Sequence, residues 1–513
     1  MAIEAPRLLF IGLDSADPSL MRKWCALGLL PNLSALISRS RQAAVTTPNG
    51  FGNSVFWSSF FTGFDPSKTS QYYYRQIEPG SYRISYFRED SDYRRKPVWE
   101  LVSENGGRVA VIDMVRAPLT PGINGVQVSD WLAHDITGSP RSWPQELISE
   151  TTAKYGGDPL GGNADIAFEM APDEVAFFQS LRDRIKTKTD MSLDLLKQGG
   201  WDLFMTAYGE SHDAGHIGWH LHDPSHPRHD AALASRLGDP MEDVYRSLDE
   251  AVGRLVEAAG KDTTIVILAG PGMGPNYTGN QLLDRVLIKL EPEATLRRSR
   301  VMPPLQAVYR NLLPISIRNR FRRLAISVED SVLGSERQHR HSFAVPHNDN
   351  SGAIRVNLIG REPSGVVKPG RDYDDYCDRL SDSLLELVNA DTGLPAVDEV
   401  VRIDAEYTGE NIAYLPDLFV VWNRASLIDA VRSPAIGEVR EKFDGSRSGD
   451  HTPHGLMLAC GPGIEPAELD GTSSVMDVGA TLFSMLGVSV PGADGKPIAG
   501  LTGRAVPEPG GVA

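Results

Sequence analysis

The segment from Gly209 to Asp223, GESHDAGHIGWHLHD, places four of the chain's twelve histidines directly after an apolar run. That run, WDLFMTAYG, is typical of a buried strand, so the histidines follow the carboxyl end of a strand. In open α/β sheets this is the edge at which ligands bind. His212 and His216 are four residues apart, share one face of a helix, and could together bind one metal ion. The alternative is that these histidines only cap or solvate the helix.

Apolar runs and amphipathic segments alternate along the rest of the chain. Leu8 to Leu13 predicts a first strand, and residues 173–199 and 240–260 predict long amphipathic helices. Further strands are expected at TTIVILAG, GAIRVNLIG, PDLFVVWNR and HGLMLACGPG. This order indicates an α/β fold with a largely parallel central sheet and helices on both faces.

The same pattern suggests how the chain is divided. We expect the first part of a core over residues 1–280, a possible arginine-rich cap or insertion over 281–345, the second part of the core over 346–505, and a disordered tail over 506–513. Within the expected cap, four arginines could recognise phosphate, sulfate or carboxylate, although a solvated helix face or a subunit contact is an equally good interpretation; they are Arg318, Arg320, Arg322 and Arg323. An oligomer therefore remains possible.

Charge and cysteine content restrict the classes of partner. The formal net charge of −16 argues against general affinity for nucleic acid or for an anionic membrane surface. The three cysteines lie far apart and give no disulfide framework, which favours a reducing compartment. No run of eighteen apolar residues is present. We therefore expect a cytoplasmic protein that acts on a small molecule.

Two further segments carry polar side chains at strand or helix ends. Asp14 lies just past the first strand, where it could bind a cation or a substrate, whereas Asp17 is better placed to cap the following helix. Farther on, GFGNS should form a turn before the helix SVFWSSFFTG. Asn53 and Ser54 at this helix start would lie where an anion can bind, although Ser54 could simply cap the helix.

Several of these blocks together resemble a known family. They are IGLDSADPSLMRKWCALGLLPNLSAL, WSSFFTGFDPSKTS, HDAGH, GPGMGP, GDHTPHGLMLACGPGI and VMDVGATLFSMLGVSVPGADGKPI. In this order they resemble the type I phosphodiesterase/nucleotide pyrophosphatase branch of the alkaline phosphatase superfamily, over nearly the whole chain. The resemblance implies an alkaline phosphatase-like fold in which two metal ions, commonly zinc, flank a threonine or serine nucleophile and hold a phosphoryl group.

The resemblance also implies roles for particular residues. Asp14 matches the first-strand aspartate of the second metal site. His212 and His216 match the DxxxH pair of the first metal site, with histidine in place of the usual aspartate, and His451 matches that site's remaining histidine. Asp213 is an alternative to His212, since its three-residue spacing from His216 also allows one helical face.

The departures from the family are equally informative. The nucleophile position falls on Asn53, with Ser54 beside it, and an amide cannot act as the family's threonine does. Gly270 and Pro271 stand where relatives carry an Asp-His pair, and neither side chain can bind metal. We therefore predict one divalent metal ion, zinc, at a three-histidine site, and the loss of the second metal site.

Three classes of function follow. The leading one is a metal-dependent hydrolase or group-transfer enzyme for a phosphate-type ester of a small anionic metabolite or nucleotide, using metal-activated water or, alternatively, Ser54 as a relocated nucleophile. The second is a metal-dependent lyase or tailoring enzyme, and the third a catalytically silent binding protein. The candidate catalytic residues are Asn53, Ser54 and Asp14, and the candidate metal ligands are His212, His216 and His451.

Overall fold

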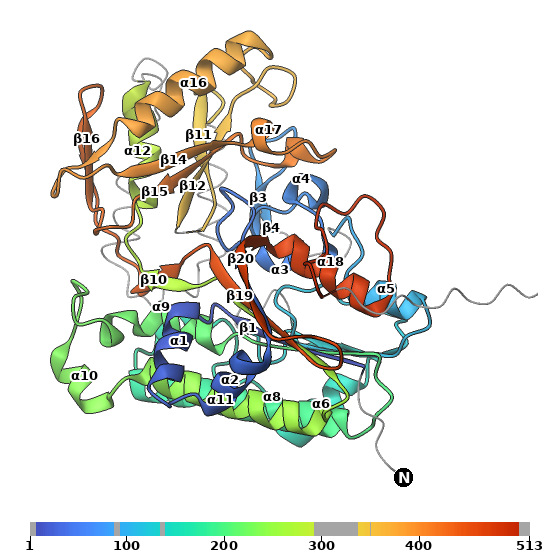
Figure 1. Cartoon of the computed structure of the whole chain (residues 1–513). Coiled ribbons are helices and arrows are strands. Elements are labelled where there is room, and N and C mark those ends of the chain that lie inside the picture. Colours follow the sequence, from blue (N-terminus) through green and yellow to red (C-terminus); the bar gives the residue numbers. More distant parts are fainter. Residues whose placement is uncertain (1–6, 87–92, 134–138, 292–336, 349, 502–513) are drawn as a thin grey trace, which may run out of the picture.

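A nine-stranded sheet forms the centre of the larger part of the molecule in the computed structural model, which describes residues 7–86, 93–133, 139–291, 337–348 and 350–501 (Figure 1). Its strand order is β20 (Ala467–Ser474), β2 (Arg41–Thr46), β19 (His454–Cys460), β9 (Thr264–Gly270), β1 (Leu8–Asp14), β8 (Leu203–Tyr208), β5 (Val109–Ile112), β6 (Gly125–Ser129) and β7 (Arg141–Trp143). The strands from β9 to β6 are parallel to one another, while β19 and β7 are antiparallel to their neighbours. The expected largely parallel sheet is confirmed.

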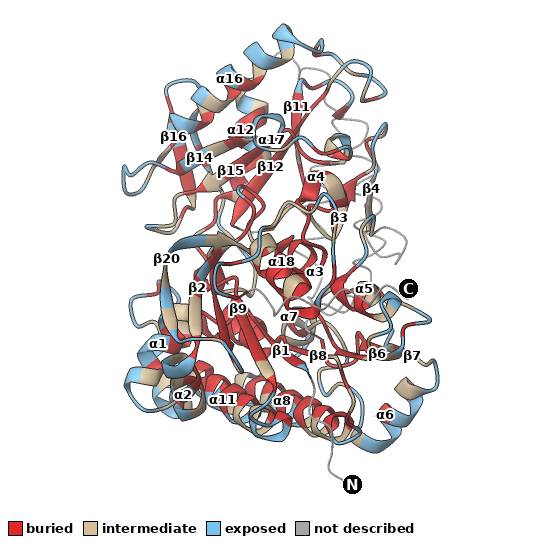
Figure 2. Cartoon of the chain, turned by 45° about the vertical axis from the view of Figure 1, so that its right-hand side comes forward, coloured by how far each residue is buried: buried red, intermediate tan, exposed pale blue. Residues whose placement is uncertain are grey.

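Helices cover both faces of this sheet, because successive residues of a buried strand point to opposite sides. On one side Leu9 and Ile11 of β1 join a core with the helices α1 (Pro18–Ala26), α2 (Pro31–Arg39), α8 (Glu174–Leu196), α9 (Glu210–His222) and α11 (Pro240–Ala259). On the other side Leu8 and Phe10 join a core with α3 (Phe56–Thr62), α5 (Val98–Glu104) and α18 (Val475–Leu486). Figure 2 shows buried residues, in red, on α8 and α11 on one side of the sheet and on α3 and α18 on the other.

A second sheet of four antiparallel strands lies beside the first. Its order is β11 (Ser342–Val345), β12 (Ser351–Val356), β15 (Leu418–Trp422) and β14 (Val397–Arg402), packed with α12 (Asn280–Leu290) and α16 (Arg371–Leu385). The strands expected at GAIRVNLIG and PDLFVVWNR do form, but in this sheet and antiparallel to each other. Alternation of strands and helices in the sequence does not distinguish two sheets from one.

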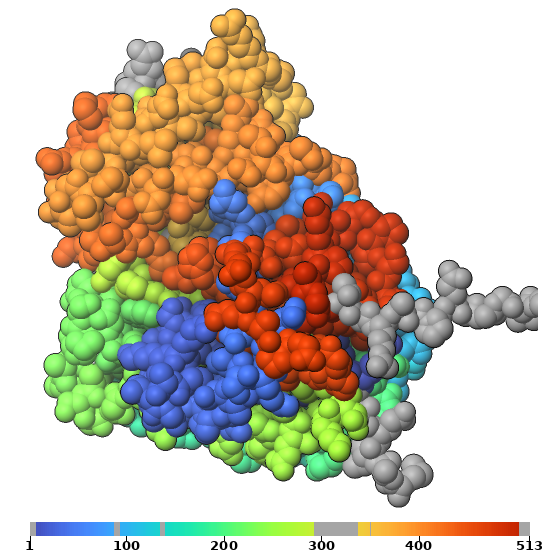
Figure 3. All heavy atoms as spheres, in the orientation of Figure 1, coloured from blue at the N-terminus to red at the C-terminus, as the bar shows by residue number. Residues whose placement is uncertain are grey.

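The chain crosses between the two parts several times. After β15 it returns to the large sheet through β18 (Gly449–His451), which pairs with β10 (Met273–Pro275). In the space-filling view, segments from the beginning and the end of the sequence, blue and red, meet on one face (Figure 3). The remaining elements are α4 (Pro66–Thr69), β3 (Arg75–Ile77), β4 (Ile84–Tyr86), α6 (Leu147–Tyr155), α7 (Ala164–Met170), α10 (Ala231–Leu237), β13 (Val388–Asn389), α17 (Ile403–Glu406), η3 (Ile412–Tyr414), β16 (Ala430–Ser433) and β17 (Gly437–Arg440).

Some expectations fall on parts of the chain that the structure does not describe. Most of the expected arginine-rich cap, including Arg318, Arg320, Arg322 and Arg323, and the tail over 506–513 lie outside the described residues. Within the described residues, no helix has both the length and the apolar character needed to span a membrane.

Candidate metal centre

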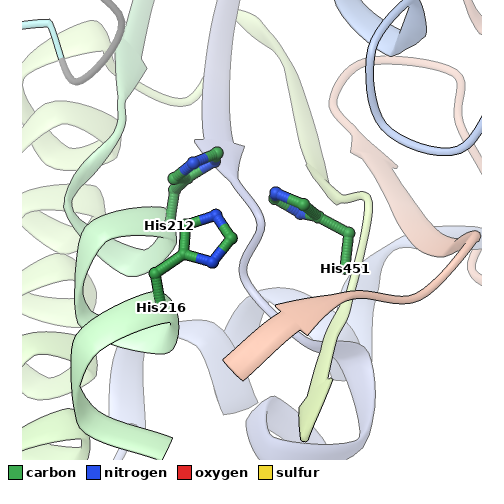
Figure 4. Close-up of side chains that lie close together, drawn as sticks. All are labelled: His212, His216 and His451. Carbon is green, nitrogen blue, oxygen red and sulfur yellow. The ribbon is translucent and has the colours of Figure 1, made fainter. Parts of the chain in front are cut away.

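Three histidines from two distant segments meet at the carboxyl edge of the large sheet (Figure 4). His212 and His216 lie one turn apart on α9, and His451 lies on β18. Each offers one ring nitrogen, and these ligand atoms lie within 4.8 Å of one another. The side chains are shielded from solvent, with exposed fractions of 7%, 0% and 1%. Three buried imidazoles in this arrangement form a donor set that suits zinc and leaves a coordination position open.

The orientation of His216 is fixed by a backbone carbonyl. Its Nδ1 lies 2.7 Å from the carbonyl oxygen of Gly449, which can only accept a hydrogen bond. Nδ1 therefore carries the proton, and Nε2 is the nitrogen left to bind a cation. A hydrogen bond of this kind holds a ligating histidine in one tautomer and one ring position.

Close backbone contact holds α9 against β18. A side chain at Gly449 would place its Cβ only 2.2 Å from the carbonyl oxygen of Gly215, so only glycine allows this approach. The amide of Ser448 donates to the carbonyl of His216 over 2.6 Å. The helix with two of the histidines and the strand with the third are thus held together by main-chain contacts.

Asp14 lies beside the histidines at the end of β1. Its Oδ2 is 3.1 Å from Nδ1 of His212, and its Oδ1 accepts a hydrogen bond of 2.7 Å from the indole Nε1 of Trp57. The neighbouring hydroxyl of Ser15 is 3.1 Å from Nδ1 of both His212 and His451. Asp14 is therefore placed to orient His212, in the way that carboxylates behind metal-ligating histidines do.

The structure brings His212, and not Asp213, into the histidine group. Oδ2 of Asp213 lies 3.1 Å from a guanidinium nitrogen of Arg184 on α8, and both side chains are buried. Burial raises the pKa of Asp213 well above its ordinary value, and the Arg184 charge opposes that increase. Asp213 thus faces α8 and not the histidine group.

Two of the positions that the resemblance assigns to a second metal site carry no ligand. Gly270 pairs with Asp14 across the sheet, and neither Gly270 nor Pro271 has a side chain that binds metal. Gly270 also has a left-handed backbone with φ 132°, and a Cβ there would lie 2.7 Å from Cα of Gly455. Within the described part of the chain, the three histidines are the one group of His, Cys, Asp or Glu suited to holding a metal. The three histidines fit a metal ion.

A pocket of about 350 Å³, including its open mouth, lies next to the histidines. It is lined by Asp14, Asn53, Ser54, Trp57, Ser58, Gln71, Val115, Arg116 and His212. Both candidate residues of the nucleophile position therefore lie in the pocket with Asp14 and His212. Gln71 and Arg116 were not among the predicted site residues; Arg116 follows the strand VAVI by only four residues, and that position at a strand's carboxyl end is a signal in the sequence.

The interpretation of Ser54 as a helix cap is wrong. The N-cap position of α3 is Val55, and no side chain caps this helix. Instead, Oγ of Ser54 accepts a hydrogen bond of 2.8 Å from Nδ2 of Asn348, in the loop between β11 and β12. The expected cap of α1 is confirmed, because Oδ1 of Asp17 accepts from the amides of Ser19 and Leu20.

Comparison with known proteins found a matching family and solved structures of similar fold. The profile described as type I phosphodiesterase / nucleotide pyrophosphatase matches residues 8–428. Phosphonoacetate hydrolase from Sinorhizobium meliloti 1021, solved in complex with phosphonoacetate, is 12% identical, with 93% of this chain and 97% of that chain covered and a TM-score of 0.51. An inactive variant of murine ectonucleotide pyrophosphatase/phosphodiesterase 5, solved with AMP, is 11% identical, with 96% and 97% covered and a TM-score of 0.50. No curated protein sequence matches the chain.

Proposed function

The chain belongs to the type I phosphodiesterase/nucleotide pyrophosphatase family, and from this premise we propose that it is a metal-dependent hydrolase or group-transfer enzyme with a mononuclear three-histidine site. The observation that carries the proposal is the convergence of His212, His216 and His451, with ligand atoms within 4.8 Å of one another. Zinc is the proposed ion, because three imidazoles are a common ligand set of catalytic zinc. A bound ion would supply Lewis-acid chemistry, stabilising charge on a phosphoryl group and activating water.

The contacts of Ser54 favour water over a serine nucleophile. Within the described structure, the hydrogen bond that Oγ of Ser54 makes comes from the amide of Asn348, which cannot accept the hydroxyl proton through that nitrogen. A serine nucleophile needs an adjacent base. Asn53 cannot replace the family's threonine either, because an amide is not a nucleophile of this kind.

The proposed substrate is a small anionic molecule with a phosphate-type ester. Relatives of the same fold have been solved with AMP and with phosphonoacetate, both small and anionic. The net charge of −16 argues against nucleic acid and anionic membranes as partners and is compatible with a cytoplasmic protein.

A second candidate is a metal-dependent lyase or tailoring reaction that no longer transfers a phosphoryl group. Gly270 and Pro271 favour it, because without ligands there the family's second ion, which shares the charge of the transferred group, has no site. A catalytically silent binding protein is the least favoured, since three buried imidazoles on two elements would serve no purpose without a cation.

The test is metal analysis of protein purified without added metal, combined with a screen of phosphodiesters, nucleotides and sulfate esters. We expect about one ion per chain, and loss of both the ion and turnover in His216→Ala, because two imidazoles do not complete the site. His220→Ala is the matched control: it lies one turn farther along α9, with Nδ1 bonded to Ser448 Oγ at 3.0 Å. Two ions per chain would refute the loss of the second site, and full metal content in His216→Ala would refute the site itself.

A further inference from the structure

Arg116 is the one residue with a permanent positive charge among the nine that line the pocket. It lies in the loop after β5, and its guanidinium carbon is 5.4 Å from the centre of the Tyr74 ring, a cation–π distance. Its backbone is left-handed, with φ 49°, which is uncommon for a residue other than glycine and is concentrated at functional sites. The fold thus places Arg116, in a loop with a strained backbone, in the lining of a pocket beside the histidines.

Ser54 contributes a hydroxyl group whose direction is defined. Its Oγ already accepts the 2.8 Å hydrogen bond from Nδ2 of Asn348, and both side chains are buried. A serine hydroxyl has one proton and two lone pairs, so with one lone pair engaged its proton is left for an acceptor. Because Ser54 lines the pocket, a ligand in the pocket can be that acceptor.

The amide of Asn348 is held in the orientation that this arrangement requires. Its Oδ1 accepts from the backbone amide of Ser351 at 3.2 Å, and its Nδ2 also donates to the carbonyl of Phe51 at 2.9 Å. A backbone amide can only donate and a carbonyl can only accept, so these two partners exclude the flipped amide. Asn348 therefore presents a donor to Ser54 and cannot present an acceptor.

We propose that Arg116 and Ser54 bind an anionic oxygen group of the substrate, a phosphate or a carboxylate, and that Asn348 is the positioning residue that makes Ser54 a donor to it. The guanidinium fork matches the geometry of such groups. Within the described structure, the buried oxygens Oδ1 of Asn53 and Oε1 of Gln71 have no hydrogen-bond partner, so both can accept from hydroxyl or other donor groups of a ligand. This proposal rests on the proposed function in one respect: it takes the neighbouring histidines as the place where the substrate reacts.

Calorimetric titration of the zinc-loaded protein with inorganic phosphate, and separately with acetate, tests the role of Arg116. Arg116→Gln should weaken binding of the preferred anion by about 10- to 100-fold, the loss expected for a charge-assisted hydrogen bond, while zinc content is unchanged. Arg22→Gln is the control, because Arg22 is an exposed arginine paired with Glu468. Tighter binding of phosphate identifies a phosphate group, and tighter binding of acetate a carboxylate. Unchanged binding in Arg116→Gln overturns the proposal, whereas absence of zinc from the wild type overturns the proposed function instead.

A second set of variants tests the hydrogen bond between Asn348 and Ser54. Asn348→Ala removes the donor, whereas Asn348→Asp places an acceptor against Ser54 and draws its proton away from the pocket. Anion affinity should therefore fall in the order wild type, Asn348→Ala, Asn348→Asp, with Arg116 present throughout. In a Ser54→Ala background, proteins with Asn348 and with Asn348→Ala should bind the anion equally, because neither side chain adds a charge. A difference that persists without Ser54 would show that Asn348 acts in another way and would overturn its positioning role.

Discussion

Trp57, in the first turn of α3, donates its indole Nε1–H to Oδ1 of Asp14 over 2.7 Å. The other oxygen of Asp14 lies 3.1 Å from Nδ1 of His212. Gly12 allows the indole to approach, because a Cβ at this position would lie 2.8 Å from the Trp57 ring. The carboxylate is therefore held on one side by an indole and faces the histidine group on the other.

Replacing Trp57 by phenylalanine should lower the free energy of unfolding by about 1–3 kcal/mol, because the buried carboxylate loses a donor. Urea unfolding measures the effect. In an Asp14→Asn background the same substitution should cost less, since a neutral acceptor gains less from the indole. Equal costs in the two backgrounds would show that the loss comes from packing of the ring and not from its hydrogen bond.

Restoring the family's Asp-His pair with Gly270→Asp and Pro271→His should not restore phosphodiesterase activity. Asn53 would still occupy the nucleophile position, and a Cβ at residue 270 would lie 2.7 Å from Cα of Gly455. We expect the double variant to be less stable and to bind no second ion. Metal analysis and an assay with a chromogenic phosphodiester test this prediction. Strong activity from these two changes alone would contradict the placement of Asn53 at the nucleophile position.

Arg184 should be the most sensitive position behind the metal centre. Its buried guanidinium pairs with Asp213 at 3.1 Å and with Asp158 at 2.5 Å. Arg184→Met leaves both carboxylates buried without their partner, which should cost about 3–5 kcal/mol in a urea titration. Arg182→Met, two residues away on the exposed side of α8, provides the comparison and should have little effect.

The protein should become less stable as the pH falls below neutral, because the folded state keeps His347 uncharged. Burial lowers the pKa of this imidazole to about 4, and its Nδ1 lies 3.0 Å from the carbonyl of Ser351. Between about pH 6.5 and 4 the unfolded chain binds a proton at His347 that the folded protein does not bind. The stabilisation that comes from keeping this imidazole neutral is therefore complete above about pH 6.5, and the free energy of unfolding falls as pH is lowered. The loss should reach up to about 3 kcal/mol.

His347→Phe should flatten this part of the pH profile, because phenylalanine does not titrate. The ring would keep its packing on Phe419, whose centroid lies 4.6 Å away. Urea midpoints measured at half-unit intervals of pH provide the comparison. Parallel profiles for the variant and the wild type would exclude His347 as the source of the pH dependence.

The sequence predicted those parts of the molecule that depend on local patterns. The strand before Asp14, the strand before the histidine segment and the long helices after Asp173 and Asp239 all form close to their expected bounds. These segments have periodicity or apolar runs that need no tertiary information. The second sheet was not recognised, because a strand's partner is determined by the packing of distant segments.

Only part of the candidate site could be predicted from the sequence, because some of its contacts join residues that are far apart in the chain. Spacing allowed either His212 or Asp213 to join His216. In the structure His212 joins it, whereas Asp213 pairs with Arg184 on α8. For Ser54, a candidate nucleophile, the alternative was a helix cap, because serine is common at a helix start. Its actual partner, Asn348, lies almost three hundred residues away, and local sequence could not reveal it.

The close contact between Gly449 and Gly215 has a thermodynamic consequence. Since main-chain contacts already hold α9 against β18, the ligands are preorganised before any ion arrives. Ion uptake then needs little conformational ordering, so its heat-capacity change should be small and most of its binding free energy should appear as added resistance to unfolding. A bulkier residue at Gly449 would separate the helix from the strand and make uptake of the ion depend on refolding of the site.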